Sequence, residues 1–172
     1  MFLLHFRPEN VIGQPVSFSL FNWALHSARQ FGSKMKIVDV AIAIIHHENR
    51  LLICQRRPDG PLAGYWEFPG GKRNENETLQ QCLQRELQEE LAIVVKPIQS
   101  LPCIEHTYSH AHVRLYPFIC QLESGEPQPL ACADFRWINP VDLPEYQFPP
   151  ANDDLIPQII TLLTQKGSGE SI

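Results

Sequence analysis

The chain has 172 residues, of which 44% are hydrophobic and 19% are charged, so it can bury the core of one domain and intrinsic disorder is disfavoured. Its 14 Lys and Arg residues against 19 Asp and Glu residues give a net charge of −5, which disfavours a nucleic-acid polymer as partner. No apolar run approaches the roughly 18 residues that a membrane-spanning helix needs, so we expect no membrane association.

Residues 1–34 differ from the rest of the chain, because Glu9 is their only acidic residue. Five apolar residues in this stretch follow helical spacing: Leu20, Phe21, Ala24, Leu25 and Ala28. Three interpretations remain open for this N-terminal extension. It is a short amphipathic helix that docks on the domain, an organelle transit peptide, or the product of a start codon assigned upstream of a true start at Met35.

Two strands and a helix are expected in the first half of the remaining chain. A nearly continuous apolar run over 38–45 predicts a buried strand, and residues 51–57 predict its hairpin partner. A helix is expected over 78–91, because Thr78 followed by Gln81 forms a capping box at its start.

The second half is rich in proline, and we expect strands over 97–105, 111–122 and 135–138. A last helix follows Asp153 or Asp154 and ends near Lys166, and residues 167–172 are expected to form a flexible tail. The order of strands and helices predicts an α/β (α+β) fold, with a mixed sheet and helices packed on it.

Four of the five cysteines stand in apolar patterns: Cys54, Cys82, Cys103 and Cys120. Free cysteine behaves as a small hydrophobic residue, so we expect these four in the core. The odd number of cysteines and the absence of a C-x-x-C pair favour a reducing compartment, and we therefore expect a cytoplasmic protein.

The helix expected over 78–91 carries three carboxylates close together. At about 100° per residue, Glu86, Glu89 and Glu90 fall within one sector about 100° wide, beside a sector that faces the core. Like charges at this spacing repel each other and destabilise a helix. The stripe is therefore either a solvated acidic face or a site for a hard cation such as Mg²⁺, which prefers oxygen ligands. Arg85 and Glu77 could pair and hold the loop before the helix.

The spacing of these residues resembles the Nudix box, G-x5-E-x7-R-E-U-x-E-E-x-G-U, where U is apolar. Eight positions match it: Gly71, Glu77, Arg85, Glu86, Leu87, Glu89, Glu90 and Ile93. The chain departs from the pattern at Ala92, where the family has a glycine that ends the helix. We expect a left-handed conformation there, which costs alanine about 1 kcal/mol in stability.

The segments 66–72 and 148–152 resemble the MutT-like branch of the Nudix hydrolases, and the resemblance places the domain over 35–166. It implies a Nudix-type α/β/α sandwich around a mixed β-sheet. It also implies a Mg²⁺-dependent monomer, with Mn²⁺ as a substitute, that hydrolyses 8-oxo-dGTP to 8-oxo-dGMP and pyrophosphate. Such an enzyme keeps oxidised guanine out of DNA.

The resemblance also implies roles for individual residues. Glu86, Glu89 and Glu90 are the expected catalytic and metal-binding residues, with the carbonyl of Gly70 as a further metal ligand. The expected substrate-binding residues are Arg57, Glu67, Phe68, Pro69, Gly70 and Asn152. An asparagine amide offers one donor and one acceptor, which matches the O6 and N7–H of 8-oxoguanine, whereas guanine offers two acceptors. The alternative for Asn152 is a helix N-cap.

Two departures leave the activity open. Ala131 stands where MutT-like proteins have a glutamate, so Glu126 or Asp134 could replace it, or Glu86 could act as the only base. The stretch 106–112 resembles the 8-oxoguanine-binding domain of the glycosylase MutY, but we interpret its histidines as exposed strand residues, with His110 and His112 on one strand face. The alternative functions are a Nudix hydrolase for ADP-ribose or a dinucleotide, and a non-catalytic 8-oxoguanine-binding module.

Overall fold

A computed structural model describes residues 35–166 of the chain. The predictions for residues 1–34 and 167–172 lie outside the described residues. Within the described part, no helix combines the length and the apolar character needed to cross a membrane.

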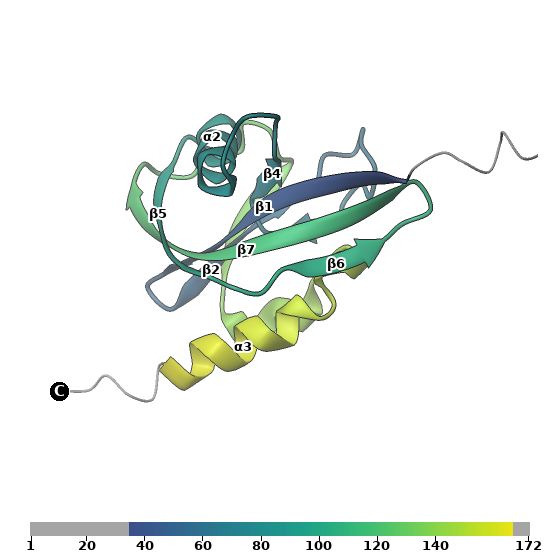
Figure 1. Ribbon diagram of the computed structural model, residues 1–172. Coiled ribbons are helices and arrows are strands. Elements are labelled where there is room, and N and C mark those ends of the chain that lie inside the picture. The colour runs from purple at the N-terminus through teal and green to yellow at the C-terminus, as the bar shows by residue number, and fades with distance from the viewer. Residues whose placement is uncertain (1–34, 167–172) are drawn as a thin grey trace, which may run out of the picture. The chain divides into compact units, whose positions relative to one another are not determined.

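The centre of the fold is a pair of long parallel strands, β1 (Lys36–His47) and β7 (Ala111–Ser124) (Figure 1). Their register runs from Lys36 opposite Ala111 to Ile45 opposite Cys120. Residues 41–45 are buried along their whole length. A strand that is covered on both faces reads as a continuous apolar run, which explains why this strand was predictable from sequence.

Six further strands complete the mixed sheet of the described residues. They are β2 (Arg50–Gln55), β3 (Trp66–Glu67), β4 (Gly70–Lys72), β5 (Val94–Ser100), β6 (Ile104–Thr107) and β8 (Asp134–Ile138). The main strand order is β3-β2-β1-β7-β5, while β4 pairs with β1, β6 with β7 and β8 with β2. Every pairing except that of β1 with β7 is antiparallel.

The two faces of the sheet each bury one hydrophobic core, and each core is closed by one helix (Figure 1). Helix α2 (Leu79–Leu91) closes the core that includes Ala43 and Ile45, and α3 (Leu155–Lys166) closes the core that includes Ile44. Successive β1 side chains therefore alternate between the two cores, as the period of two in a strand requires. The predicted α/β/α sandwich around a mixed sheet is confirmed.

Several local predictions were wrong. The strand expected over 97–105 is two strands, β5 and β6, separated by residues 101–103. Pro102 lies in that break, where its missing N–H removes no ladder bond. Cys103 lies there too and is exposed, so its expected place in the core was wrong. The short strands β3 and β4 were not predicted.

The histidine prediction was also wrong in part. Tyr108 N–H donates to the Ala111 carbonyl oxygen at 2.9 Å, which closes the turn between β6 and β7. His110 therefore lies in a turn and not beside His112 on a strand face. His112 lies in β7, and its ring contacts Thr107 and Glu105 on β6.

The proline-rich stretch between β8 and α3 contains two short 3-10 helices, η1 (Pro140–Glu145) and η2 (Pro150–Asn152). Each begins with proline, whose fixed φ suits the first turn and whose missing N–H has no partner there in any case. Because η2 precedes α3, it brings Asn152 against the sheet before the last helix begins.

The capping box at the start of α2 is confirmed. Thr78 Oγ1 accepts from the Gln81 N–H at 3.2 Å, and Gln81 Oε1 accepts from the Thr78 N–H at 2.8 Å. At the other end, Ala92 has φ 55° and ψ 34°, the left-handed conformation that was expected there. A Cβ is strained in this conformation, because it approaches the following carbonyl oxygen.

Replacing Ala92 by Gly should raise the free energy of unfolding by about 1 kcal/mol, because glycine adopts this conformation without strain. Urea denaturation measures the change. Gln84→Gly is the matched control, since Gln84 is exposed inside α2 and glycine there should lower stability by about 1 kcal/mol. A fall in stability for both variants would contradict the assignment of strain to Ala92.

Candidate active site

A cavity of about 720 Å³ opens beside β4 and is large enough for a nucleotide-sized ligand. It is bounded by β1, β2, β4, the loop after β2, the turn between β6 and β7, and η2. Its lining includes charged groups, such as Arg57, Lys72 and Glu90, and apolar ones, such as Phe68. This combination suits a ligand with an anionic part and a flat apolar part.

Two consecutive glycines in β4 let the backbone enter this region. Gly70 has φ 140°, and a Cβ on it would lie 2.2 Å from the Ala41 carbonyl oxygen on β1. A Cβ on Gly71 would lie 2.2 Å from the carboxyl carbon of Glu86 on α2. The β4 backbone is therefore packed between β1 and the acidic stripe of α2, against rigid backbone at Gly70 and against a flexible side chain at Gly71.

Glu90 also faces this backbone, because the Gly70 N–H donates to Glu90 Oε2 at 3.4 Å. Burial and, to a smaller extent, the nearby charge of Glu67 together raise the pKa of Glu90 to about 8. Burial likewise raises the pKa of Glu67, although its ion pair with Arg56 opposes this shift. Two carboxylates thus share a partly buried region in which a cation would be stabilised.

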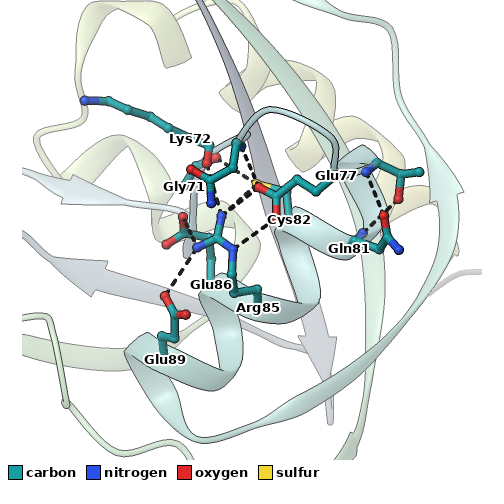
Figure 2. A network of polar contacts seen from close by, with 10 residues as sticks. Gly71, Lys72, Glu77, Gln81, Cys82, Arg85, Glu86 and Glu89 are labelled. Atoms are coloured by element: carbon teal, nitrogen blue, oxygen red, sulfur yellow. Dashed lines mark hydrogen bonds and ion pairs between the residues drawn. The ribbon is translucent and has the colours of Figure 1, made fainter.

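Arg85 connects the other acidic residues of the box, as Figure 2 shows. Its guanidinium donates to both carboxylate oxygens of Glu77, at 3.1 and 2.8 Å, so the expected pairing is present. It also donates to Glu86 at 2.8 Å and to Glu89 at 3.3 Å. The same group donates to the Lys72 carbonyl oxygen at 3.2 Å, which joins α2 to the end of β4.

Glu77 is held on its other side by the backbone, because the Asn74 N–H donates to Glu77 Oε1 at 2.6 Å. Its hydrogen bonds from Arg85 and Asn74 lower the pKa of Glu77 to about 2. The carboxylate therefore stays ionised through neutral pH, and it ties the loop between β4 and α2 to Arg85 of the helix.

Asn152 is the buried polar residue of the described core, with 7% of its surface exposed, and it lines the cavity. It lies in η2, and α3 begins only at Leu155, so the alternative of an N-cap for α3 does not fit. Its Nδ2 donates to the Pro149 carbonyl oxygen at 3.3 Å. One amide hydrogen and the amide oxygen remain for a ligand.

Some of the other predicted site residues line the cavity and some do not. Glu67, Phe68 and Gly70 line the cavity, and the Phe68 ring packs 5.1 Å from that of Phe148. Arg57 lines it with a largely exposed side chain, 3.8 Å from Asp59. Pro69 does not line it.

Pro69 is buried, and its carbonyl oxygen accepts from the Ala43 N–H on β1 at 2.8 Å. Glu86 and Glu89 do not line the cavity as it stands, and both contact Arg85. Through residues 35–166, no three His, Cys, Asp or Glu side chains are already arranged to hold a metal ion.

Ala131 lines the cavity, where the resemblance led us to look for a glutamate. Neither Glu126 nor Asp134 lines it, so neither proposed replacement is brought to this position. Asp134 instead accepts from the Phe135 N–H and lies 3.5 Å from Arg136.

Sequence reasoning missed several residues that line the cavity: Cys54, Lys72, Tyr108, His110 and Cys132. Tyr108 and His110 lie in the turn between β6 and β7. The alternation of His110 and His112 in the sequence suggested a strand there, so the turn was not recognised. No sequence signal identified Cys54 and Cys132, because a tertiary contact between β2 and the loop before β8 brings them together.

A family model described as the NUDIX domain matches residues 40–158, which include β4, α2 and η2. The chain belongs to the Nudix family. The match covers most of the described domain, so the Nudix box assignment no longer depends on spacing alone.

The names of similar proteins support the assignment of this Nudix chain as a hydrolase. It is 33% identical to the 8-oxo-dGTP diphosphatase of Escherichia coli K12 over 126 residues, 73% of this chain and 98% of that protein. It is 32% identical to the CTP pyrophosphohydrolase of the same organism, over 74% of this chain and 95% of that one. A solution structure of the Nudix hydrolase MutT from Staphylococcus aureus has a TM-score of 0.63 and 31% identity, over 74% of this chain and 98% of that chain.

Gly70→Ala and Gly71→Ala should have different effects. Gly70→Ala places a Cβ against rigid β1 backbone at a φ reserved for glycine, so we expect a loss of about 1–3 kcal/mol in unfolding free energy. Gly71→Ala meets only the end of the flexible Glu86 side chain, so stability should fall less while the carboxylate moves. Chemical denaturation of both variants tests this, and equal losses would contradict it.

Proposed function

We propose that this Nudix hydrolase is a Mg²⁺-dependent pyrophosphohydrolase that converts 8-oxo-dGTP to 8-oxo-dGMP and pyrophosphate. The observation that carries the proposal is that one cavity holds both the Glu90 end of the acidic stripe and the buried amide of Asn152. The first suits a metal–triphosphate complex, and the second suits a nucleobase edge. The relatives named as 8-oxo-dGTP diphosphatases support this choice of substrate.

The donor set fits a divalent metal. Nudix and MutT proteins generally use one, and the proposed ligands are the carboxylates of Glu86, Glu89 and Glu90 with the carbonyl oxygen of Gly70. All are oxygen atoms, which Mg²⁺ prefers, and Mn²⁺ accepts the same ligands. When bound, the metal neutralises phosphate charge and lowers the pKa of a water molecule. The Arg85 guanidinium donates to both Glu86 and Glu89 and so holds these two proposed ligands close together.

The remaining proposed steps use groups of the chain itself. Arg57 and Lys72 line the cavity and are placed to bind phosphate oxygens, while Phe68 offers an apolar surface to the base. Glu67 is held by Arg56, and Pro69 fixes the backbone on β1. We assign the proton-accepting role to the Glu86 carboxylate, because it lies against Gly71, a residue of the cavity wall, whereas Asp134 is turned to the Phe135 N–H and Arg136.

Asn152 is proposed to read the base. Its amide oxygen accepts from the N7–H of 8-oxoguanine and its free amide hydrogen donates to O6, whereas guanine presents an acceptor at N7. Burial increases the cost of the mismatch, because an unpaired polar group cannot turn to water.

A second candidate substrate is CTP, which the name of the 32% identical Escherichia coli relative supports. The sequence is also compatible with hydrolysis of ADP-ribose or a dinucleotide, and with binding of 8-oxoguanine without hydrolysis. Binding without hydrolysis gives no reason for the Arg85 network around three carboxylates. We further propose that the domain, residues 35–166, acts as a cytoplasmic monomer on free nucleotides and not on nucleic-acid polymers.

Glu90→Gln should lower Mg²⁺-dependent pyrophosphate release by about 100-fold or more. The metal-free variant should be as stable as the wild type or more stable, because a crowded buried charge is removed. The folded-state pKa of Glu90 is raised from 4.5 to about 8, so its ionisation should make the wild type less stable as pH rises across that range. Thermal unfolding of both proteins from pH 5 to 8 measures this.

Glu75→Gln is the matched control, because Glu75 is exposed in the loop before α2 and lines no cavity. It should change neither pyrophosphate release nor the pH dependence of stability. Wild-type turnover of Glu90→Gln at saturating Mg²⁺ would overturn the metal assignment.

Asn152→Ala should reduce discrimination between 8-oxo-dGTP and dGTP. An unmet buried polar group costs about 1–3 kcal/mol, which corresponds to roughly a 5- to 150-fold preference. The measurement is the ratio of kcat/KM for the two substrates, with CTP assayed beside them. Asn139→Ala is the control, since Asn139 is exposed and does not line the cavity. An unchanged ratio, or a higher kcat/KM with CTP, would return Asn152 to a structural role.

A further inference from the structure

Two thiols that the proposed reaction does not use meet in the wall of the active-site cavity. Cys54 lies in β2 and Cys132 lies in the loop that precedes β8, and both line the cavity. The Cys54 thiol is 2% exposed and belongs to the hydrophobic core closed by α2, and Cys132, which is only partly buried, packs against the same core. The two thiols are near enough for each to shift the pKa of the other. Both are free thiols in the structure.

The loop that carries Cys132 is held by backbone contacts on both sides. The Ala133 N–H donates to the Gln55 carbonyl oxygen of β2 at 2.9 Å. The Leu130 and Ala131 N–H groups donate to the Glu90 carbonyl oxygen of α2, at 3.0 and 3.3 Å. A change in the position of Cys132 is therefore transmitted to the end of α2 that carries Glu90.

We propose that Cys132 and Cys54 are a peroxide-sensitive pair, which forms a reversible disulfide across the cavity wall and lowers turnover. The proposal concerns a modification site, and its effect on turnover rests on the proposed function. Formation of the disulfide itself does not depend on that function.

The environment assigns different roles to the two thiols. Cys132 is only partly buried, which gives a peroxide access to it, and the neighbouring Cys54 thiol lowers the pKa of Cys132, which favours its thiolate. Cys54 is buried and its pKa is raised, so it remains a thiol until Cys132 has reacted. Cys132 is thus the residue that reacts with peroxide, and Cys54 is the resolving residue.

The oxidation balances in two steps. The Cys132 thiolate attacks one oxygen of hydrogen peroxide, the O–O bond breaks, and Cys132 becomes a sulfenic acid while the second oxygen leaves as water after taking a proton. The Cys54 sulfur then attacks the Cys132 sulfur, the S–O bond breaks, and the departing hydroxide takes the Cys54 proton to form water. The two thiols lose two electrons in total, and peroxide accepts them.

The remaining cysteines do not offer a competing pair. Cys82 is buried, with its thiol directed to the Gly71 carbonyl oxygen at 3.4 Å, and Cys120 is buried against the Phe118 carbonyl oxygen. Cys103 is exposed in the break between β5 and β6 and does not line the cavity. It therefore serves as a control for unspecific thiol oxidation.

The test treats the full chain with hydrogen peroxide and counts thiols after denaturation. We expect the loss of two of the five thiols, recovered with dithiothreitol, and a proteolytic peptide pair that joins Cys54 to Cys132. Pyrophosphate release from 8-oxo-dGTP should fall with the same time course and return on reduction.

Three variants make the result decisive. Cys132→Ser should keep its remaining thiols and its own activity under the same treatment, and Cys54→Ala should stop at a sulfenic acid that dimedone traps on Cys132. Cys103→Ser should behave like the wild type. A disulfide through Cys103, oxidation of Cys132 to sulfinic acid in the wild type, or no loss of thiols would overturn the proposal. If the disulfide forms but pyrophosphate release does not fall, the proposed effect on turnover is wrong. If the untreated protein releases no pyrophosphate at all, the proposed function is wrong, but the result on disulfide formation still stands.

Discussion

The close approach of the β4 backbone to β1 on one side and to α2 on the other is the constraint on which the site depends. It requires glycine at Gly70, where a Cβ would lie 2.2 Å from the Ala41 carbonyl oxygen, and at Gly71 a Cβ would displace the Glu86 carboxylate. The approach brings main-chain groups beside the Glu86 and Glu90 carboxylates, and carboxylates with carbonyl oxygens are the ligands that a hard cation needs. A larger residue at Gly70 would push β4 away from β1, and one at Gly71 would displace the Glu86 carboxylate.

Repulsion within the acidic stripe is the cost of this arrangement, and the fold offsets it with a single guanidinium. Arg85 donates to Glu77, Glu86 and Glu89 and also to the Lys72 carbonyl oxygen, so one side chain links the stripe, the loop and β4. Glu90 is outside this network. Its pKa is raised by burial and, to a smaller extent, by repulsion from the nearby charges of Glu67 and Glu86. The stability of α2 thus depends on the capping box at its start and on the packing of its inner face against the core. Its acidic face is available for chemistry.

The cavity joins elements that serve both hydrophobic cores. Phe68 and Ala151, the neighbour of Asn152, belong to the core closed by α3, whereas Cys54 and Cys132 belong to the side closed by α2. The loop before β8 completes the wall on the α2 side, where this chain has Ala131 and Cys132. A nucleotide in this cavity would therefore contact the same loop that the thiol pair ties to β2.

The sequence by itself determined the local features of this protein. The apolar run of β1, the capping box of α2, the left-handed end at Ala92 and the pairing of Arg85 with Glu77 all follow from residues close in sequence or at fixed helical spacing. Only the tertiary structure decided the position of Asn152 in the cavity, the division of residues 97–105 into two strands, the exposure of Cys103 and the meeting of Cys54 with Cys132. These depend on contacts between residues distant in sequence, and periodicity carries no information about which distant segments pair. The short strands β3 and β4 were missed for the same reason, because two or three residues have no pattern of their own and become strands only through their partners β2 and β1.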